Sequence, residues 1–125
     1  MKPFATVLLA LCLVLPLCAC ATAPVPFPSP AELEAAHYGD FPGDYEGIIR
    51  FAPQLALYSP EKCRYYFSAE PRKQAVEVRG RYEYGWGGYV EIGLVDQLDN
   101  YLGNFPFVYL IRDDKLVYFD SVNGW

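Results

Sequence analysis

The chain has 125 residues, with 15 acidic and 10 basic side chains and a formal net charge of −5. This length suffices for one domain. The acidic balance argues against a nucleic-acid partner, which needs a basic surface, and against electrostatic adhesion to anionic lipid headgroups.

Residues 1–19 are predicted to be a secretory signal peptide. Lys2 provides one positive charge, and residues 4–17 are apolar except for Thr6 and Pro16. This run is shorter than the roughly 20 residues of a membrane-spanning helix, and its order of charge, apolar stretch and small residues is typical of a leader. A buried N-terminal helix fits less well, because prolines follow from Pro24 onward. Without the leader, nine basic and 15 acidic side chains remain, a balance of −6.

The segment Leu17–Cys20 resembles the bacterial lipobox, in which a leader peptidase cuts before a lipid-modified cysteine. It predicts cleavage between Ala19 and Cys20 and lipidation of Cys20; plain secretion is the alternative. Cys18 departs from the motif, since Ala, Ser, Thr or Val is usual there. Two or more fatty chains give stable anchoring. In enteric bacteria an Asp after the lipidated cysteine retains the protein in the inner membrane. Ala21 stands at that position here, which favours the periplasmic face of the outer membrane.

Residues 20–30 are predicted to form a lipidated, proline-rich tether. Proline stands at every second position from Pro24 to Pro30, which favours the extended polyproline II conformation. A ligand for a proline-reading partner is the alternative. Once Cys20 is acylated, Cys63 is the only free thiol in an oxidising compartment. We expect it to be a small buried residue, with an intermolecular disulfide as the alternative.

Residues 31–125 are predicted to form a single domain that begins with two short helices. Ser29 and Glu32 stand in the pattern of a capping box, which predicts a helix over residues 30–36. A second helix is predicted after the turn residues 40–44, and Pro53 ends or kinks it. Its apolar residues repeat with helical spacing: Tyr45, Ile48, Ile49 and Ala52.

From residue 63 onward the pattern is typical of β-strands. Alternating or apolar runs occupy residues 63–68, 75–81, 89–95, 105–112 and 116–119, with a tight turn predicted at Asp113-Asp114. This order predicts an α+β fold, with one or two N-terminal helices packed on an antiparallel sheet of about four or five strands. The hairpin of residues 105–112 and 116–119 is apolar on both faces, which indicates a central place in the sheet or a face covered by a partner.

Four segments resemble landmarks of small uncharacterised proteobacterial lipoproteins: Tyr38–Glu46, Ser59–Tyr65, Asn100–Gly103 and Tyr109–Asp113. In those proteins a helix opens with a Tyr-Pro-x-x-Tyr-like segment, and an Asn-rich loop precedes a hairpin. Residues 96–100 depart from that loop, because Asp replaces much of its Asn and Lys. The resemblance implies a location and a fold, and no activity.

Patterns for catalysis and cofactors are weak. His37 is the single histidine and is expected to face solvent at a helix end. Gly85–Gly88 lacks the Lys-Ser/Thr of a phosphate loop and is expected to form a bulge or turn between strands.

Two sets of acidic residues are candidate sites. Asp96, Asp99 and Asn100 offer oxygen ligands for Ca²⁺ but lack the glycine and distal Glu of an EF-hand, so an ordinary acidic loop is expected. A carboxylate pair for glycoside chemistry would have to come from Glu77, Glu83 and Glu91, whose spacing in the sequence does not place two of them together. We therefore predict no catalytic residue, no metal and no cofactor, and the chain is not expected to be an enzyme.

Aromatic residues are the most distinctive feature, with 11 Tyr, 8 Phe and 2 Trp. Tyr82, Tyr84 and Trp86 share one face if their stretch is extended. They are expected to pack in the core, with a protein interface or a glycan-binding face as alternatives. The sequence therefore predicts an outer-membrane-anchored periplasmic lipoprotein, a non-enzymatic binding or accessory module of the envelope. The alternative is a periplasmic enzyme inhibitor or a peptidoglycan- or glycan-binding lipoprotein.

Overall fold

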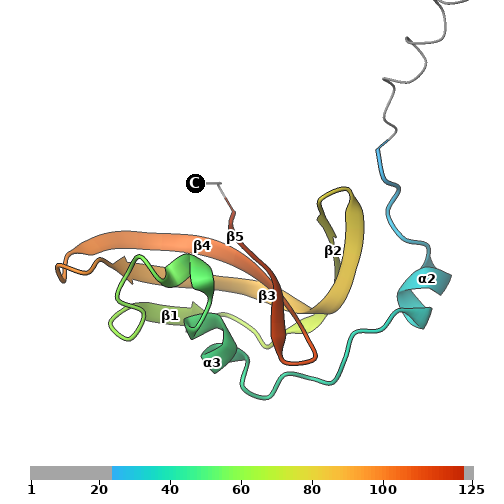
Figure 1. Ribbon diagram of the computed structural model, residues 1–125. Coiled ribbons are helices and arrows are strands. Elements are labelled where there is room, and N and C mark those ends of the chain that lie inside the picture. The colour runs from blue at the N-terminus through green and yellow to red at the C-terminus, as the bar shows by residue number, and fades with distance from the viewer. Residues whose placement is uncertain (1–23, 123–125) are drawn as a thin grey trace, which may run out of the picture.

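The computed structural model describes residues 24–122 (Figure 1), so the predicted leader and the cleavage and lipidation residues Ala19 and Cys20 lie outside the described residues. The domain is an α+β fold dominated by one antiparallel sheet. Its five strands are β1 (Arg64–Phe67), β2 (Arg72–Val78), β3 (Arg81–Val95), β4 (Tyr101–Arg112) and β5 (Lys115–Ser121). Its helices are α2 (Pro30–Ala35), α3 (Tyr45–Arg50) and the 3-10 turn η1 (Pro53–Leu55).

The long strand β3 organises the sheet. The strand order is β1-β3-β4-β5, and β1 and β2 pair with the same edge of β3, one after the other along its length. Because β4 pairs only with residues 86–95 of β3, residues 81–85 and β2 form a hairpin that extends past β4. This hairpin bends away from the side of the sheet on which α3 lies (Figure 1).

The first helix has its predicted cap, and the second helix contributes to the core. The Ser29 hydroxyl accepts a hydrogen bond from the backbone N–H of Glu32 at 3.2 Å, which confirms the predicted cap of α2. In α3 Ile49 is fully buried, whereas α2 buries no residue. Ile49 belongs to a core cluster that includes Leu55, Val90, Ile92, Leu94, Phe107, Tyr109 and Ile111.

The final hairpin matches the sequence pattern. Asp113 and Asp114 have positive φ angles of 53° and 60°, as a two-residue hairpin turn requires. Of the hairpin that was expected to be central, β4 is interior but β5 forms an edge of the sheet, so the expectation holds for only one of its two strands. Leu110 is fully buried on the face opposite the core cluster, which explains the apolar character of both faces.

Two expectations about β2 and β3 are wrong. Gly85–Gly88 forms no bulge or turn but lies inside β3. A Cβ on Gly85 would lie 2.5 Å from the Ile111 carbonyl oxygen, so glycine lets the neighbouring strand approach closely. The predicted strand over residues 75–81 is interrupted, because Arg79 and Gly80 have φ angles of 53° and 82° and form the turn between β2 and β3.

The thiol of Cys63 is buried, as predicted, with 7 % of the residue exposed. The backbone N–H of Val95 points at its sulfur, 3.4 Å away. We expect Cys63 of the folded protein to react with a thiol reagent only after denaturation, and to form no disulfide-linked dimer on non-reducing gels after oxidation. Rapid labelling in native buffer, or a dimer band that reductant removes, would contradict this burial.

Candidate functional site

The predicted aromatic face exists on β3, where Tyr82, Tyr84 and Trp86 alternate along one side. Residues 27–41, which we call the docked segment, cover it with edge-on ring contacts. The ring pairs are Phe27–Tyr82 at 5.4 Å, Tyr38–Tyr84 at 5.9 Å and Phe41–Trp86 at 5.2 Å between centroids. The indole N–H of Trp86 also donates to the Gly39 carbonyl at 2.9 Å. This packing favours a structural role for the three rings.

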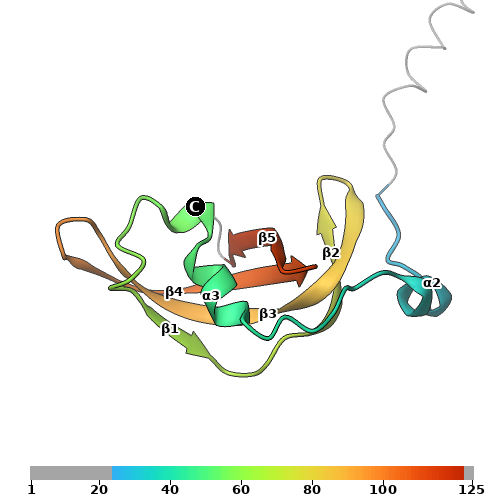
Figure 2. The same ribbon diagram turned by 60° about the horizontal axis from the view of Figure 1, so that its bottom comes forward.

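Polar contacts hold the docked segment as it passes the β2–β3 hairpin on its way to α3 (Figure 2). His37 is exposed and lies 3.0 Å from a carboxylate oxygen of Asp113, in the turn between β4 and β5. Lys73 of β2 lies over the ring of Tyr38, 5.4 Å from its centroid. Because Pro28 is buried as well, the far end of the predicted tether belongs to the packed domain.

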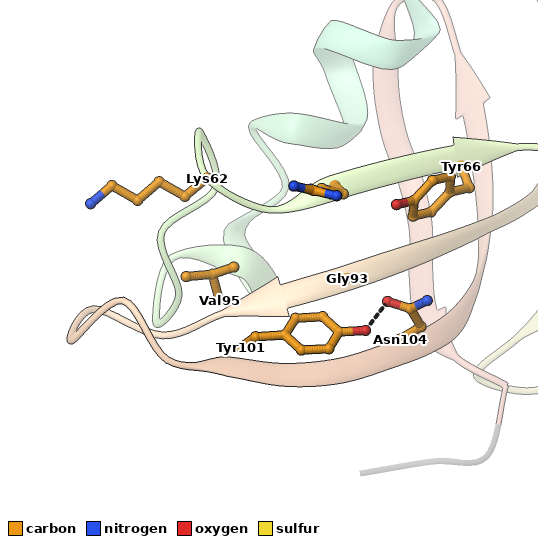
Figure 3. A pocket seen from close by; sticks show the side chains of 7 residues that line it. Lys62, Tyr66, Gly93, Val95, Tyr101 and Asn104 are labelled. Atoms are coloured by element: carbon orange, nitrogen blue, oxygen red, sulfur yellow. Dashed lines mark hydrogen bonds between the residues drawn. The ribbon is translucent and has the colours of Figure 1, made fainter.

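An open groove of about 390 Å³ lies on the other face of the sheet (Figure 3). Its floor is Gly93 of β3, which alternates with the core residues Ile92 and Leu94 and therefore faces away from α3. Gly93 pairs with Arg64 of β1 and with Asn104 of β4, so these three residues form one row across the sheet. The groove is lined by Lys62, Arg64, Tyr66, Gly93, Val95, Tyr101 and Asn104.

The groove exists because its central position is a glycine. A Cβ on Gly93 would lie 2.9 Å from the Asn104 amide oxygen and 3.4 Å from the Tyr101 ring. This site was not among those predicted from the sequence. A glycine within the alternating run 89–95 was the available signal, since glycine inside a strand often marks a close approach.

Two tyrosines form the walls. Tyr66 is 50 % exposed and Tyr101 is 63 % exposed. The Tyr101 hydroxyl donates to the amide oxygen of Asn104, which holds its ring along the groove (Figure 3). The amide nitrogen of Asn104 makes no hydrogen bond to any described residue, so it is available as a donor.

The two cations of the groove differ in their surroundings. Lys62 contacts Asp99 at 2.5 Å, and this hydrogen bond raises the pKa of its ammonium group. Arg64, by contrast, has no acidic partner within residues 24–122. The guanidinium of Arg64 is therefore the unpaired positive group of the groove.

The acidic loop beside the groove satisfies its own polar groups. Asp96 accepts hydrogen bonds from the backbone N–H groups of Asn100 at 2.8 Å and Leu98 at 2.9 Å. The hydrogen bond from Asn100 holds the pKa of Asp96 below its ordinary value. Asp99 of this loop is paired with Lys62. Within residues 24–122, no group of three or more His, Cys, Asp or Glu side chains is placed to hold a metal ion.

We compared the chain with protein-family models, curated proteins and solved structures. Nothing matches it. Among the helices of residues 24–122, none has the length and apolar character needed to cross a bilayer.

The three glutamates weighed for catalysis do not converge. Glu77 pairs with Tyr82 and Glu83 with Val76, so the two carboxylates point to opposite faces of the hairpin. Glu83 is bound to Arg112 at 3.1 Å. Glu91 lies eight residues beyond Glu83 on β3, roughly 26 Å along an extended strand, whereas glycosidase carboxylates stand about 5–9.5 Å apart.

A buried phenol also lies away from the groove. The hydroxyl of Tyr109 is buried and makes no hydrogen bond to a described residue. Burial raises the pKa of Tyr109 to about 12, which keeps the phenol protonated at neutral pH. Because its ring belongs to the core cluster, Tyr109 faces away from the groove.

Proposed function

We propose that the protein is a lipoprotein of the bacterial outer membrane, exposed to the periplasm, that acts as a non-enzymatic binding module. The leader and the Leu17–Cys20 motif support the anchor, and membership of the small proteobacterial lipoproteins is part of the proposal. In this arrangement the anchor is Cys20, and a single domain that includes the docked segment follows it, with helical structure packed on the sheet.

Because the docked segment begins at Phe27, only a short tether would separate the domain from the lipid anchor. Seven residue steps separate Cys20 from Phe27, which extend over about 22–25 Å at most. Phe27 contacts Tyr82 near the turn of the β2–β3 hairpin. The hairpin would therefore be held near the bilayer, while the rest of the sheet would extend from it.

The groove over Gly93 is the observation that carries the binding role. It combines exposed aromatic walls with an unpaired guanidinium and a free amide donor on a regular sheet, the kind of apolar surface with a few polar groups that ligand sites use. Of the two alternatives, an enzyme inhibitor and a glycan-binding lipoprotein, this groove favours the second. Tyrosine rings beside polar donors form a surface on which a sugar ring can stack. An inhibitor would instead present a protruding loop to the enzyme.

Photo-crosslinking in cells tests the binding role. With p-benzoylphenylalanine in place of Tyr101, we expect an ultraviolet-dependent product of higher mass in the membrane fraction. A matched control is the same substitution at Phe51, which is 88 % exposed and follows α3. No product from Tyr101, or the same product from both positions, would refute the groove as the binding site.

A further inference from the structure

The unpaired guanidinium and the tyrosine walls define a ligand class. We infer that the groove over Gly93 binds a sugar that bears a carboxylate, with the carboxylate on Arg64 and the sugar ring against Tyr101. This inference rests on the proposed binding function and adds the chemistry of the ligand.

The charge of the groove points to an anion. The chain has a net charge of −5, yet the described residues that line the groove include two cations and no acidic side chain. Asp99 neutralises Lys62, which leaves Arg64 as one free positive charge. A guanidinium fork matches the two oxygens of a carboxylate. A single free cation suits a monoanionic carboxylate better than a doubly charged phosphate.

The walls and floor point to a sugar. Tyr66 and Tyr101 present half-exposed rings, while the Asn104 amide nitrogen supplies a donor for a hydroxyl or acetamido oxygen. A peptide added as a strand needs unpaired backbone groups. The floor provides none, since Gly93 has β1 on one side and β4 on the other. A ligand that lies on this floor therefore binds through side chains.

Two matched sugars test the inference. N-acetylmuramic acid and N-acetylglucosamine differ only in the lactyl ether, which bears the carboxylate. Saturation-transfer NMR on the full-length lipoprotein in detergent micelles is expected to give a Kd at least tenfold lower for N-acetylmuramic acid. Glucose 6-phosphate tests whether the groove instead prefers a phosphate. Micelles without protein correct for sugar that associates with the detergent.

Variants assign the preference to the groove. Arg64→Gln is expected to remove the difference between the two sugars, and Arg64→Lys to weaken acid binding several-fold because the fork is lost. Gly93→Val is expected to abolish binding of both sugars by filling the hollow, and Tyr101→Ala to weaken both. Arg50→Gln, on the α3 side, is the matched control and should change nothing. Circular dichroism melts identify any variant that fails to fold.

The outcomes separate the two proposals. Equal affinity for both sugars, tighter binding of glucose 6-phosphate, or no saturation transfer to any sugar from the folded protein would overturn the ligand class. If Tyr101 still gave its specific crosslink in cells, the binding module would stand without that ligand. A missing crosslink together with missing sugar binding would overturn both.

Discussion

Replacing Ile49 by Asp is expected to lower the free energy of unfolding by at least about 3 kcal/mol. Ile49 is fully buried, and burying such a side chain contributes about 1.5–3 kcal/mol. The substitution also places an unpaired carboxylate among apolar groups, and that desolvation adds to the cost. Since small domains have about 5–15 kcal/mol of stability, the variant should melt far below the parent or fail to accumulate. Urea unfolding followed by circular dichroism measures the change.

Phe51→Asp provides the control for this prediction. It introduces the same charge two residues further along, at a side chain that is 88 % exposed, and should change stability by about 0.5 kcal/mol or less. Equal losses in both variants would show that α3 does not use Ile49 to pack on the sheet. An unchanged melting curve for Ile49→Asp would place this helical face in solvent.

Replacing Cys20 by Ser is expected to abolish acylation and, with it, the lipid anchor. A hydroxyl cannot take the thioether-linked diacylglycerol, so the chain should remain as precursor or appear as unanchored protein. Metabolic labelling with an alkyne fatty acid, followed by membrane fractionation, measures both effects. Without its fatty chains the acidic protein has no electrostatic means of adhering to anionic headgroups.

Cys18→Ser is the matched control, because Cys18 leaves with the leader if cleavage occurs after Ala19. We expect this variant to be labelled like the parent. Labelling that survives in Cys20→Ser and disappears in Cys18→Ser would move the modified residue to Cys18. Labelling of both variants alike would show that neither cysteine is by itself required for acylation.

Much of the local structure follows from neighbouring residues alone. Ser29 caps α2 because its hydroxyl reaches an N–H three residues away. The Asp113-Asp114 turn was predictable because two-residue hairpins favour residues that tolerate positive φ. Burial of Ile49 and Cys63 followed from the spacing of apolar residues in a helix and a strand. These features depend either on contacts between residues close in the chain or on the repeat spacing of apolar residues in one helix or strand. Both kinds of information are present in a single sequence.

Other features depend on which distant segments meet, and only the tertiary structure decided them. Gly85–Gly88 has the composition of a turn but forms part of a strand, because β4 lies close enough to exclude a side chain. The docked segment covers a face whose rings are more than 40 residues away in the chain. The groove likewise joins Arg64, Gly93 and Asn104 from three strands. Register across a sheet is set by side-chain packing between strands, so the composition of each strand predicts its face but not its neighbours.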